Sequence, residues 1–284
     1  MLKEICCFLK LNGFKSDLLI RKGQEVVFVQ CGEGDSSSVR CIVPVSVCAG
    51  SSTEAQKQAD EIAELLETLE SEGIESIVIT EDRWRRQGKM MKARLLAHLD
   101  VFTSLYARNC EVRKVDKETA APFLAENHSY GDAACRYRYG LYLRRPSRDG
   151  QLQAGTLVAV ATFSNARKWV KGEKTIRSYE WTRYASLPGV RISGGMGKML
   201  KAFIKEVQPD DIMSYADLEW SEGKVYEQLG FVLEGTKDPV IFVVDGQWGR
   251  VPVKPETAAE SDPGNRFFQN QGSNKYRLKL TQYE

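Results

Sequence analysis

The stretch from Ser193 to Gly197, SGGMG, has a composition that would suit the binding of a phosphate group. It lies between Tyr179 to Ala185, whose alternation predicts a strand, and Gly195 to Glu206, whose apolar spacing predicts an amphipathic helix. The first turn of that helix would present unpaired backbone N–H groups and the positive end of the helix dipole. Glycines leave these groups uncovered, so an anion is the expected ligand. A simple turn is the other interpretation, because glycine clusters are common where a strand meets a helix.

The order of the parts that follow favours binding. An apolar strand is expected at Asp211 to Ala216 and a helix at Ser221 to Leu229, and Gly230-Phe231 opens a further strand. This order resembles the GNAT family of N-acetyltransferases. In that family an R/Q-x-x-G-x-G/A loop holds the pyrophosphate of acetyl-CoA, and a later helix ends in Y-x-x-x-G-F. Gly195 and Gly197 match the first motif, and Tyr226, Gly230 and Phe231 match the second.

The resemblance implies that acetyl-CoA, or another acyl-CoA, is a cosubstrate bound at this turn. The arginine of the motif is expected at Ile192 but stands one place earlier, at Arg191, which favours binding by backbone amides over binding by a side chain. The implied cofactor-binding residues are Leu187, Arg191, Ile192, Ser193, Gly194, Gly195, Met196, Gly197 and Lys198.

Acyl transfer to an amine needs a base for the amine and an acid for the departing thiolate. The resemblance implies Glu180, on the strand before the glycines, as the base and Tyr226 as the acid. A salt bridge from Glu180 to Arg183 or to a nearby cation is an equally good interpretation. Packing of the aromatic ring is the alternative for Tyr226. Strand alternation places Glu180 and Tyr184 on one face and Tyr179, Trp181 and Arg183 on the other.

Composition places the chain among soluble globular proteins and leaves its partners open. It has 284 residues, of which 42% are hydrophobic and 27% charged, so two domains are expected. The net charge of +2 neither favours nor excludes a polyanionic partner. Seven cysteines without metal-type spacing predict free thiols in a reducing compartment. With no apolar run long enough for a signal peptide or a membrane span, we expect a cytoplasmic protein.

The N-terminal region reads as a small α/β domain. Three β-rich runs, Leu18 to Ile20, Glu25 to Gln30 and Val39 to Val47, predict an antiparallel meander. A long helix is expected from Thr53 to Glu72, followed by a buried strand from Ile74 to Ile79.

A second resemblance covers most of the chain. IESIVITEDRW, KARLLAHL and YARNCEVRKV, together with SYADLEWSEGKVYEQLGF from Ser214 to Phe231, look like phage homing endonucleases that join a restriction-endonuclease-like fold to a GNAT-like domain. Such nucleases need clustered carboxylates for Mg²⁺. Asp17 matches the first acid, but Gln30 stands where the second is expected, so we interpret the N-terminal domain as a degenerate nuclease-like module. Its remaining role could be dimerisation, DNA contact or domain support.

A basic helix from Arg85 to Leu99 is the candidate DNA contact. A solvated helix face is the simpler explanation of such a run, although a phosphate backbone would also suit it. Its cations, with no acid among them, are Arg83, Arg85, Arg86, Lys89, Lys92 and Arg94.

The C-terminal region begins with a strand at Cys110 to Val115, a helix at Lys117 to Glu126, and two paired strands at Tyr137 to Arg144 and Leu157 to Phe163. His128, in the loop after this helix, is more simply structural than catalytic. A later loop, which would attract an acidic substrate or the 3′-phosphate of CoA, carries Arg167, Lys168, Lys171, Lys174 and Arg177 against Glu173 alone. Asp217 and Glu219 would end a strand near the site or cap the helix that follows.

The sequence therefore predicts an α/β protein with a mixed, mostly antiparallel central sheet of GNAT type and a smaller N-terminal α/β domain. The expected parts are the N-terminal domain at 1–106, the GNAT-like domain at 109–245, and a polar connector with a C-terminal edge strand at 246–284. Two function classes remain open: an acyl-CoA-dependent N-acyltransferase acting on an unidentified amine, and a DNA-associated protein with a non-catalytic GNAT-like domain. No membrane association is expected.

Overall fold

A computed structural model describes residues 1–32, 38–221, 223–254 and 265–282. The chain forms two compact units, and three separate stretches of chain build each of them. The first unit contains Met1–Asp100, Asp217–Glu222 and Thr236–Ser273, and the second contains Val101–Ala216, Gly223–Gly235 and Asn274–Glu284. This division differs from the predicted contiguous boundaries, because residues after 216 return to the first unit and the last residues return to the second.

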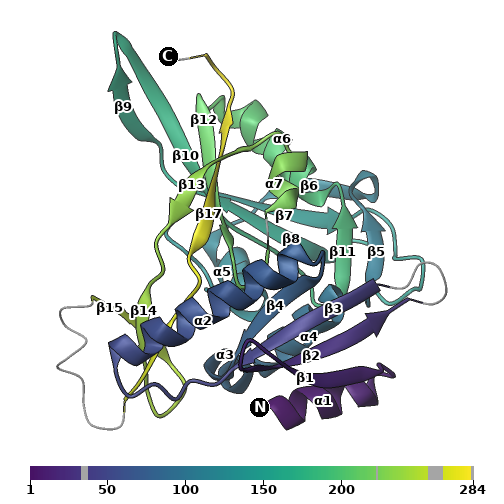
Figure 1. The fold of residues 1–284 in the computed structure, drawn as a ribbon. Coiled ribbons are helices and arrows are strands. Elements are labelled where there is room, and N and C mark those ends of the chain that lie inside the picture. Colours follow the sequence, from purple (N-terminus) through teal and green to yellow (C-terminus); the bar gives the residue numbers. More distant parts are fainter. Residues whose placement is uncertain (33–37, 222, 255–264, 283–284) are drawn as a thin grey trace. The chain divides into compact units, whose positions relative to one another are not determined.

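A four-stranded sheet in the order β1-β2-β3-β4 forms the centre of the first unit (Figure 1). The predicted antiparallel meander is present as β1 (Ser16–Arg21), β2 (Gln24–Cys31) and β3 (Ser38–Val45). The predicted buried strand is β4 (Glu75–Thr80), which runs parallel to β3. A two-residue turn, Lys22-Gly23, joins β1 to β2 with positive φ at both residues, as a tight hairpin requires.

Helices cover both faces of this sheet. On one face α1 (Leu2–Leu11), a helix that the sequence analysis did not predict, packs its buried Ile5 and Leu9 against β2 together with residues of α4. On the other face lies α2 (Ser52–Ser71), the predicted long helix, whose start is capped by Ser51. Each face therefore has its own hydrophobic core.

A second, three-stranded sheet packs on α2, and two of its strands lie where a polar connector was predicted. Its strands are β14 (Ile241–Val244), β15 (Arg250–Val253) and β16 (Arg266–Gln269), in the order β15-β14-β16. Phe242, Val244 and Phe268 share one buried cluster with Ile62 and Leu65 of α2. Apolar residues in this part of the chain thus complete the first unit. Part of the predicted connector, residues 255–264, lies outside the described residues.

The predicted basic helix is two helices, α3 (Glu81–Arg86) and α4 (Gly88–His98), which meet at Gln87. The backbone angles of Gln87, φ −120° and ψ 31°, depart from those of a helix and separate α3 from α4. Trp84, Met90 and Met91 are buried in the core on the α1 face, so this segment also packs on the first sheet. None of the described helices is long and apolar enough to cross a membrane.

A mixed, mostly antiparallel sheet of eight strands forms the second unit, as predicted. Its order is β13-β17-β12-β10-β8-β7-β6, and β9 pairs with β10. The pairs β6–β7, β7–β8, β8–β10 and β9–β10 are antiparallel, whereas β10 and β12 are parallel. The strands are β6 (Cys110–Lys114), β7 (Tyr137–Leu143), β8 (Leu157–Phe163), β9 (Arg167–Lys171), β10 (Lys174–Ser186), β12 (Asp211–Asp217), β13 (Val232–Lys237) and β17 (Ser273–Lys279).

The predicted basic loop between 164 and 178 is a β-hairpin. β9 pairs with the first half of β10 from Arg167↔Ser178 to Lys171↔Lys174, so β10 is longer than the predicted strand. Figure 1 shows this hairpin extending beyond the rest of the sheet. The β-branched and aromatic residues Trp169, Val170, Thr175 and Ile176 explain why a strand pair forms here.

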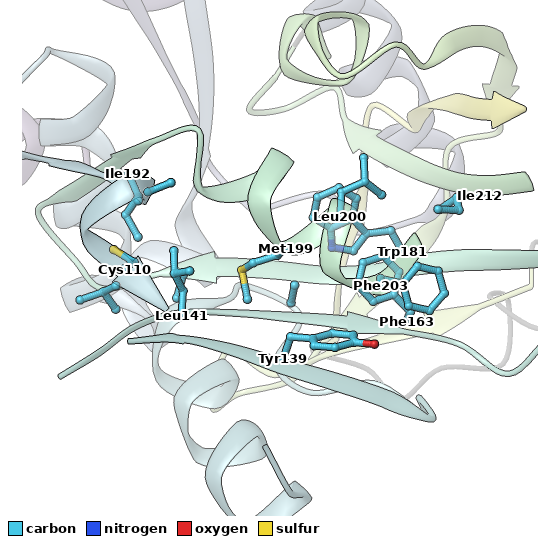
Figure 2. Close-up of a cluster of buried hydrophobic side chains, with 14 of the residues drawn as sticks. Cys110, Tyr139, Leu141, Phe163, Trp181, Ile192, Met199, Leu200, Phe203 and Ile212 are labelled. Atoms are coloured by element: carbon cyan, nitrogen blue, oxygen red, sulfur yellow. The ribbon is translucent and has the colours of Figure 1, made fainter. Parts of the chain in front are cut away.

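Two helices cover the faces of this sheet. α5 (Lys117–Asn127) packs on one face through Ala120 and Leu124. α6 (Gly195–Val207) packs on the other, where the ring of Phe203 stacks on Phe163 with their centroids 3.9 Å apart. Figure 2 shows Met199, Leu200 and Phe203 of α6 beside Phe163, Trp181 and Tyr139 of the sheet. This aromatic core fixes α6 across the centre of the sheet.

The strand predicted at the C-terminal edge, β17, lies inside the sheet between β13 and β12. The side chain of Tyr276 on β17 is only 1% exposed, in agreement with an interior position of this strand. Arg277 binds acids on both neighbours: its Nη1 lies 2.6 Å from Asp211 Oδ1 on β12, and its Nε lies 2.7 Å from Glu234 Oε1 on β13. These ion pairs explain why a polar sequence occupies an interior position.

We predict that Arg277→Met destabilises the protein by about 3–5 kcal/mol, because it removes the counter-charge of the fully buried Asp211 carboxylate. The matched control is Lys275→Met, which breaks a partly exposed pair with Glu234 and should cost less than about 1 kcal/mol. The urea midpoint of each variant measures the difference. Equal shifts in the two variants would contradict the role assigned to Arg277.

Candidate functional site

The start of α6 is an uncapped helix N-terminus. β11 (Val190–Ser193), which pairs in parallel with β5 (Thr103–Tyr106), ends directly before it. Gly194 is left-handed, with φ 75°, and no side chain caps the helix there. The first-turn N–H groups of Gly195, Met196 and Gly197 have no acceptor within the helix, as in any α-helix. The predicted phosphate-binding turn is therefore shorter than expected, since only Gly194 lies between strand and helix.

Close packing explains the two paired glycines. A Cβ on Gly195 would lie 3.0 Å from the side chain of Ile192 and 3.1 Å from the hydroxyl of Tyr184. A Cβ on Gly197 would lie 3.1 Å from Leu229. These distances are shorter than ordinary contacts, so the glycines allow α6 to approach its neighbours closely, and Gly195 itself is buried.

Several of the predicted cofactor-binding side chains are engaged elsewhere. Ile192 is buried in the core, and Leu187 and Met196 pack against that core. Lys198 Nζ donates to the carbonyl oxygens of Ala107 at 2.8 Å and Cys110 at 2.6 Å, so it is hydrogen-bonded to the backbone at the start of β6. Arg191 lies over the ring of Phe102, whereas Ser193 and Gly194 are exposed. Arg191, Ser193 and Gly194 are therefore the exposed residues at this turn, and Met196 and Gly197 are half-buried.

β10 and β12 stop pairing in the middle of the sheet. Their parallel register covers only Ser178 to Glu180 against Asp211 to Met213. Immediately afterwards β10 bulges: Trp181 pairs with Phe163 of β8 and Arg183 with Thr162, so Thr182 is an extra residue. The bulge overturns the predicted alternation. Tyr184 now packs toward α6, on the same side as Trp181.

A hydrogen-bonded chain links Tyr226 to the backbone at this point. Ser214 Oγ, on β12, lies 3.0 Å from the carbonyl oxygen of Trp181 and 2.9 Å from the hydroxyl of Tyr226. A carbonyl oxygen only accepts, and Ser214 has a single hydroxyl proton. When Ser214 donates that proton to Trp181, the hydroxyl of Tyr226 donates to Ser214.

Tyr226 lies on α7 (Lys224–Gln228) among aromatic rings. It stacks on Tyr276 at 5.3 Å and meets Trp181 and Phe231 edge-on. Burial raises the pKa of Tyr226, and the hydrogen bond with Ser214 opposes that shift only in part. Its phenol is therefore held in place and stays protonated at neutral pH.

Glu180 lies on the opposite face of the sheet from Tyr226. Its neighbours Tyr179 and Trp181 are both buried in the core beneath α6, so the side chain of Glu180 between them points to the other face. It is half-buried there, and no ion pair with Arg183 is found among the described residues. Arg183 instead donates to the carbonyl oxygens of Gly131 and Thr182. The structure thus places both predicted groups beside the end of the β10–β12 pairing, on two different faces.

Glu219 and Asp217 do not belong to this site. The first unit contains both, and Glu219 is fully buried there, with its Oε2 2.7 Å from Nη1 of Arg83. The backbone of Glu219 accepts from Val78 of β4 at 2.8 Å. Burial raises the pKa of Glu219 to about 7, and the Arg83 guanidinium opposes this rise. Neither the site nor the helix-cap prediction for Glu219 was correct, because its partner lies 136 residues away in the sequence.

The same ion pair removes Arg83 from the candidate DNA contacts, since its side chain is 4% exposed. Arg85 pairs with Glu4 and Glu81, Lys92 lies over the rings of Phe8 and Trp84, and Arg94 lies over Trp220. Arg86 and Lys89 are exposed. DNA binding by this segment stays a prediction that rests mainly on these two residues.

The remaining candidate residues, His128, Asp17 and Gln30, lie outside this site. His128 ends α5, and its Nδ1 accepts from the backbone N–H of Tyr130 at 3.2 Å. Asp17 and Gln30 lie exposed on β1 and β2. In the described part of the chain, no group of three or more histidine, cysteine, aspartate or glutamate side chains could hold a metal ion.

Comparison with known proteins finds similarity only among solved structures. No protein-family model and no curated protein matches the sequence. The matching structures include Eis1 from Mycobacterium abscessus, with 14% identity over 47% of this chain and 33% of Eis1, and a TM-score of 0.34. The ribosomal-protein-S5-alanine acetyltransferase from Vibrio fischeri has 10% identity over 62% and 96% of the two chains, with a TM-score of 0.37.

A third structure, described as the histone acetyltransferase HPA2 and related acetyltransferase from Corynebacterium glutamicum, has 13% identity over 71% of this chain and 82% of its own, with a TM-score of 0.31. This chain spans only about a third of Eis1. The resemblance to phage homing endonucleases receives no support from these comparisons. At such low identities and scores, no statement about activity follows from the matches.

The sequence did not reveal the role of Ser214 or the bulge, and it predicted the wrong strand face for Tyr184. Ser214 alternates with the buried Ile212 and Ala216 on β12, so a polar residue on an apolar face was a usable signal. Tyr184 could not be placed near Gly195, because the extra residue at Thr182 changes its face and nothing in the sequence marks a bulge.

We predict that the buried Arg83–Glu219 pair behaves as a unit. Arg83→Met alone should lower the free energy of unfolding by about 3–5 kcal/mol, because it leaves a buried carboxylate without its counter-charge. The double variant Arg83→Met/Glu219→Leu should recover most of this loss. Urea midpoints of the single and double variants measure the coupling, and simple addition of the two losses would show that the residues act independently.

Proposed function

We propose that the second unit transfers an acyl group from an acyl-CoA to an amine. The observation that carries the proposal is the end of the β10–β12 pairing at Glu180, where a carboxylate stands on one face and a tyrosine hydroxyl on the other. The uncapped start of α6 lies farther along β10, beside the hydroxyl of Tyr184. One strand thus connects a candidate phosphate site with a candidate site for proton transfer.

The residues present fit a pyrophosphate through backbone groups. The N–H groups of Gly195, Met196 and Gly197 and the helix dipole would hold the negative charge, and no capping side chain competes for that position. Ile192 and Tyr184 hold the turn in shape through their contacts with Gly195. Lys198 is assigned to the backbone carbonyls that it binds and has no part in phosphate binding. When bound, the acyl-CoA would supply an activated thioester.

The two residues that would handle protons, Glu180 and Tyr226, lie on different faces of the sheet. An acceptor amine must lose a proton before it can attack, and Glu180 would take that proton, directly or through a water, on its own face. The amine adds to the carbonyl carbon of the thioester, and the C–S bond then breaks so that the thiolate leaves. Glu180 would therefore act on the amine, and Tyr226 would act on the sulfur as the C–S bond breaks.

Tyr226 is better suited to hydrogen bonding than to complete proton transfer. A phenol is a weaker acid than a thiol by about 1.5 pKa units, and burial raises the pKa of Tyr226 further, so full transfer to a thiolate would be uphill. Donation of a hydrogen bond to the developing charge needs no such transfer. For this the hydroxyl would turn from Ser214 toward the sulfur, while Ser214 donates to Tyr226.

We predict that wild-type protein binds acetyl-CoA and that Ser193→Glu binds it at least about tenfold more weakly, because a negative charge then stands at the start of α6. The fold should be unharmed, since an acid at a helix N-terminus is favourable. Isothermal titration calorimetry measures both affinities. Gln151→Glu adds the same charge on an exposed loop of the second unit and should bind as wild type does. No binding by wild type, or equal weakening in both variants, would refute the proposed site.

We also predict that Tyr226→Phe lowers turnover by about 10²–10³-fold while the affinity for acetyl-CoA changes little, because the hydroxyl acts on charge that develops during the reaction. Thiol release from acetyl-CoA with a panel of amines measures turnover. Glu180→Gln should lose turnover as well, with a changed pH profile. The control variant is Tyr215→Phe, which removes a tyrosine hydroxyl from β12, the strand that also carries Ser214. A normal rate in Tyr226→Phe would leave this residue a purely structural role.

A further inference from the structure

The outer edge of the first sheet is an apolar strand. β1 is the first strand in the order β1-β2-β3-β4, so among the described strands only β2 pairs with it. Leu18, Leu19 and Ile20 occupy its centre and are 50%, 46% and 73% exposed. An edge strand of this kind usually carries charged or proline residues that prevent pairing with other chains. Here the charges, Asp17 and Arg21, stand only at the two ends.

Hydrogen bonding to β2 shows which backbone groups of β1 face outward. The N–H of Gln30 donates to the carbonyl oxygen of Lys15 at 3.4 Å, and the register continues with Ser16 opposite Val29. Hydrogen-bonded and non-hydrogen-bonded pairs alternate along an antiparallel ladder. The odd-numbered residues of β1 therefore direct their backbone groups to β2. The even-numbered residues, Ser16, Leu18 and Ile20, direct theirs to the open edge.

The side chains of β1 divide between the two faces. Leu18 pairs with Val27, whose side chain belongs to the core on the α1 face. Leu19 pairs with Val26, which belongs to the core on the α2 face. Arg21 lies on this second face too, since it pairs with Glu72 at the end of α2 and lies over Phe28. Apolar surface is therefore exposed on both faces of the same edge.

One antiparallel register makes this strand complementary to itself. With a two-fold axis at Leu19, the outward-facing Leu18 meets the outward-facing Ile20 of the second copy, and Asp17 meets Arg21 of the second copy. Opposite charges and apolar side chains then pair across the strands. An axis at Leu18 would set Asp17 against a leucine, and an axis at Ile20 would set Arg21 against a leucine. Of these three registers, the one centred on Leu19 pairs Asp17 with Arg21 at both ends of the strand.

We propose that β1 is a dimerisation edge, on which a second copy of this chain adds its own β1 in antiparallel orientation about Leu19. The two four-stranded sheets then form one continuous sheet with an isologous interface. The exposed N–H and C=O groups of Leu18 and Ile20 gain partners, and the apolar side chains on both faces are covered.

Cross-linking tests the register in the full-length protein. In a chain whose exposed Cys7 and Cys48 are replaced by serine, Leu19→Cys should form a disulfide-linked dimer on mild oxidation. Residues in a non-hydrogen-bonded pair have Cα atoms about 4.5 Å apart, and a disulfide spans about 4.4–6.8 Å. Leu18→Cys is the control, because two copies of residue 18 are not opposite each other. Equal cross-linking at the two positions, or none at Leu19→Cys, would overturn the proposal.

Sedimentation velocity tests the interface itself. Ile20→Lys should weaken dimerisation at least about tenfold, because it replaces an apolar contact by a charge at the edge. Leu11→Lys makes the same kind of change at a residue of α1 that is 80% exposed and off the edge, and its dimerisation should match wild type. Circular dichroism checks that both variants fold. A monomeric wild-type protein, or equal effects of the two substitutions, would reject β1 as the dimer edge.

Discussion

The stack of Phe203 on Phe163 is the contact on which the arrangement of the second unit depends. The two rings are parallel, with centroids 3.9 Å apart, and Trp181 stacks on Phe163 from the next strand. Because Phe203 is in the middle of α6, this contact holds the middle of the helix against the sheet. The place of its N-terminus, and so of any anion bound there, depends on a hydrophobic contact within the aromatic core.

The bulge at Thr182 determines on which face of the sheet the later side chains of β10 lie. Without the extra residue, Tyr184 would point away from α6 and Gly195 would have no aromatic neighbour. With it, β10 changes partners: its first part pairs with β9 and β12, and its second part pairs with β8. The carbonyl of Trp181 lies at this change, which explains why a side chain, Ser214, donates to it.

Local patterns predicted most of the elements, and contacts between distant parts of the chain account for the failures. Periodic apolar residues were enough for α2, and alternation was enough for β2 and β3. The burial of Glu219 depends on Arg83, and the interior position of β17 depends on Asp211 and Glu234. For the candidate site, the glycine turn and Tyr226 were found from motifs. Their hydrogen-bond partners were not, because a bulge or a long-range pair leaves no periodic signal in the sequence.

The interleaving of the two units has a consequence for synthesis on the ribosome. β12 and β13 are complete by residue 237, but the strand that lies between them, β17, begins only at Ser273. Until then, the edges of both strands that face β17 lack their hydrogen-bonding partner. The first unit is likewise incomplete until residues 236–273 have been translated. The first unit therefore cannot be complete before most of the second has been translated, and the second cannot be complete before the whole of the first, so the nascent chain holds two incomplete units at the same time.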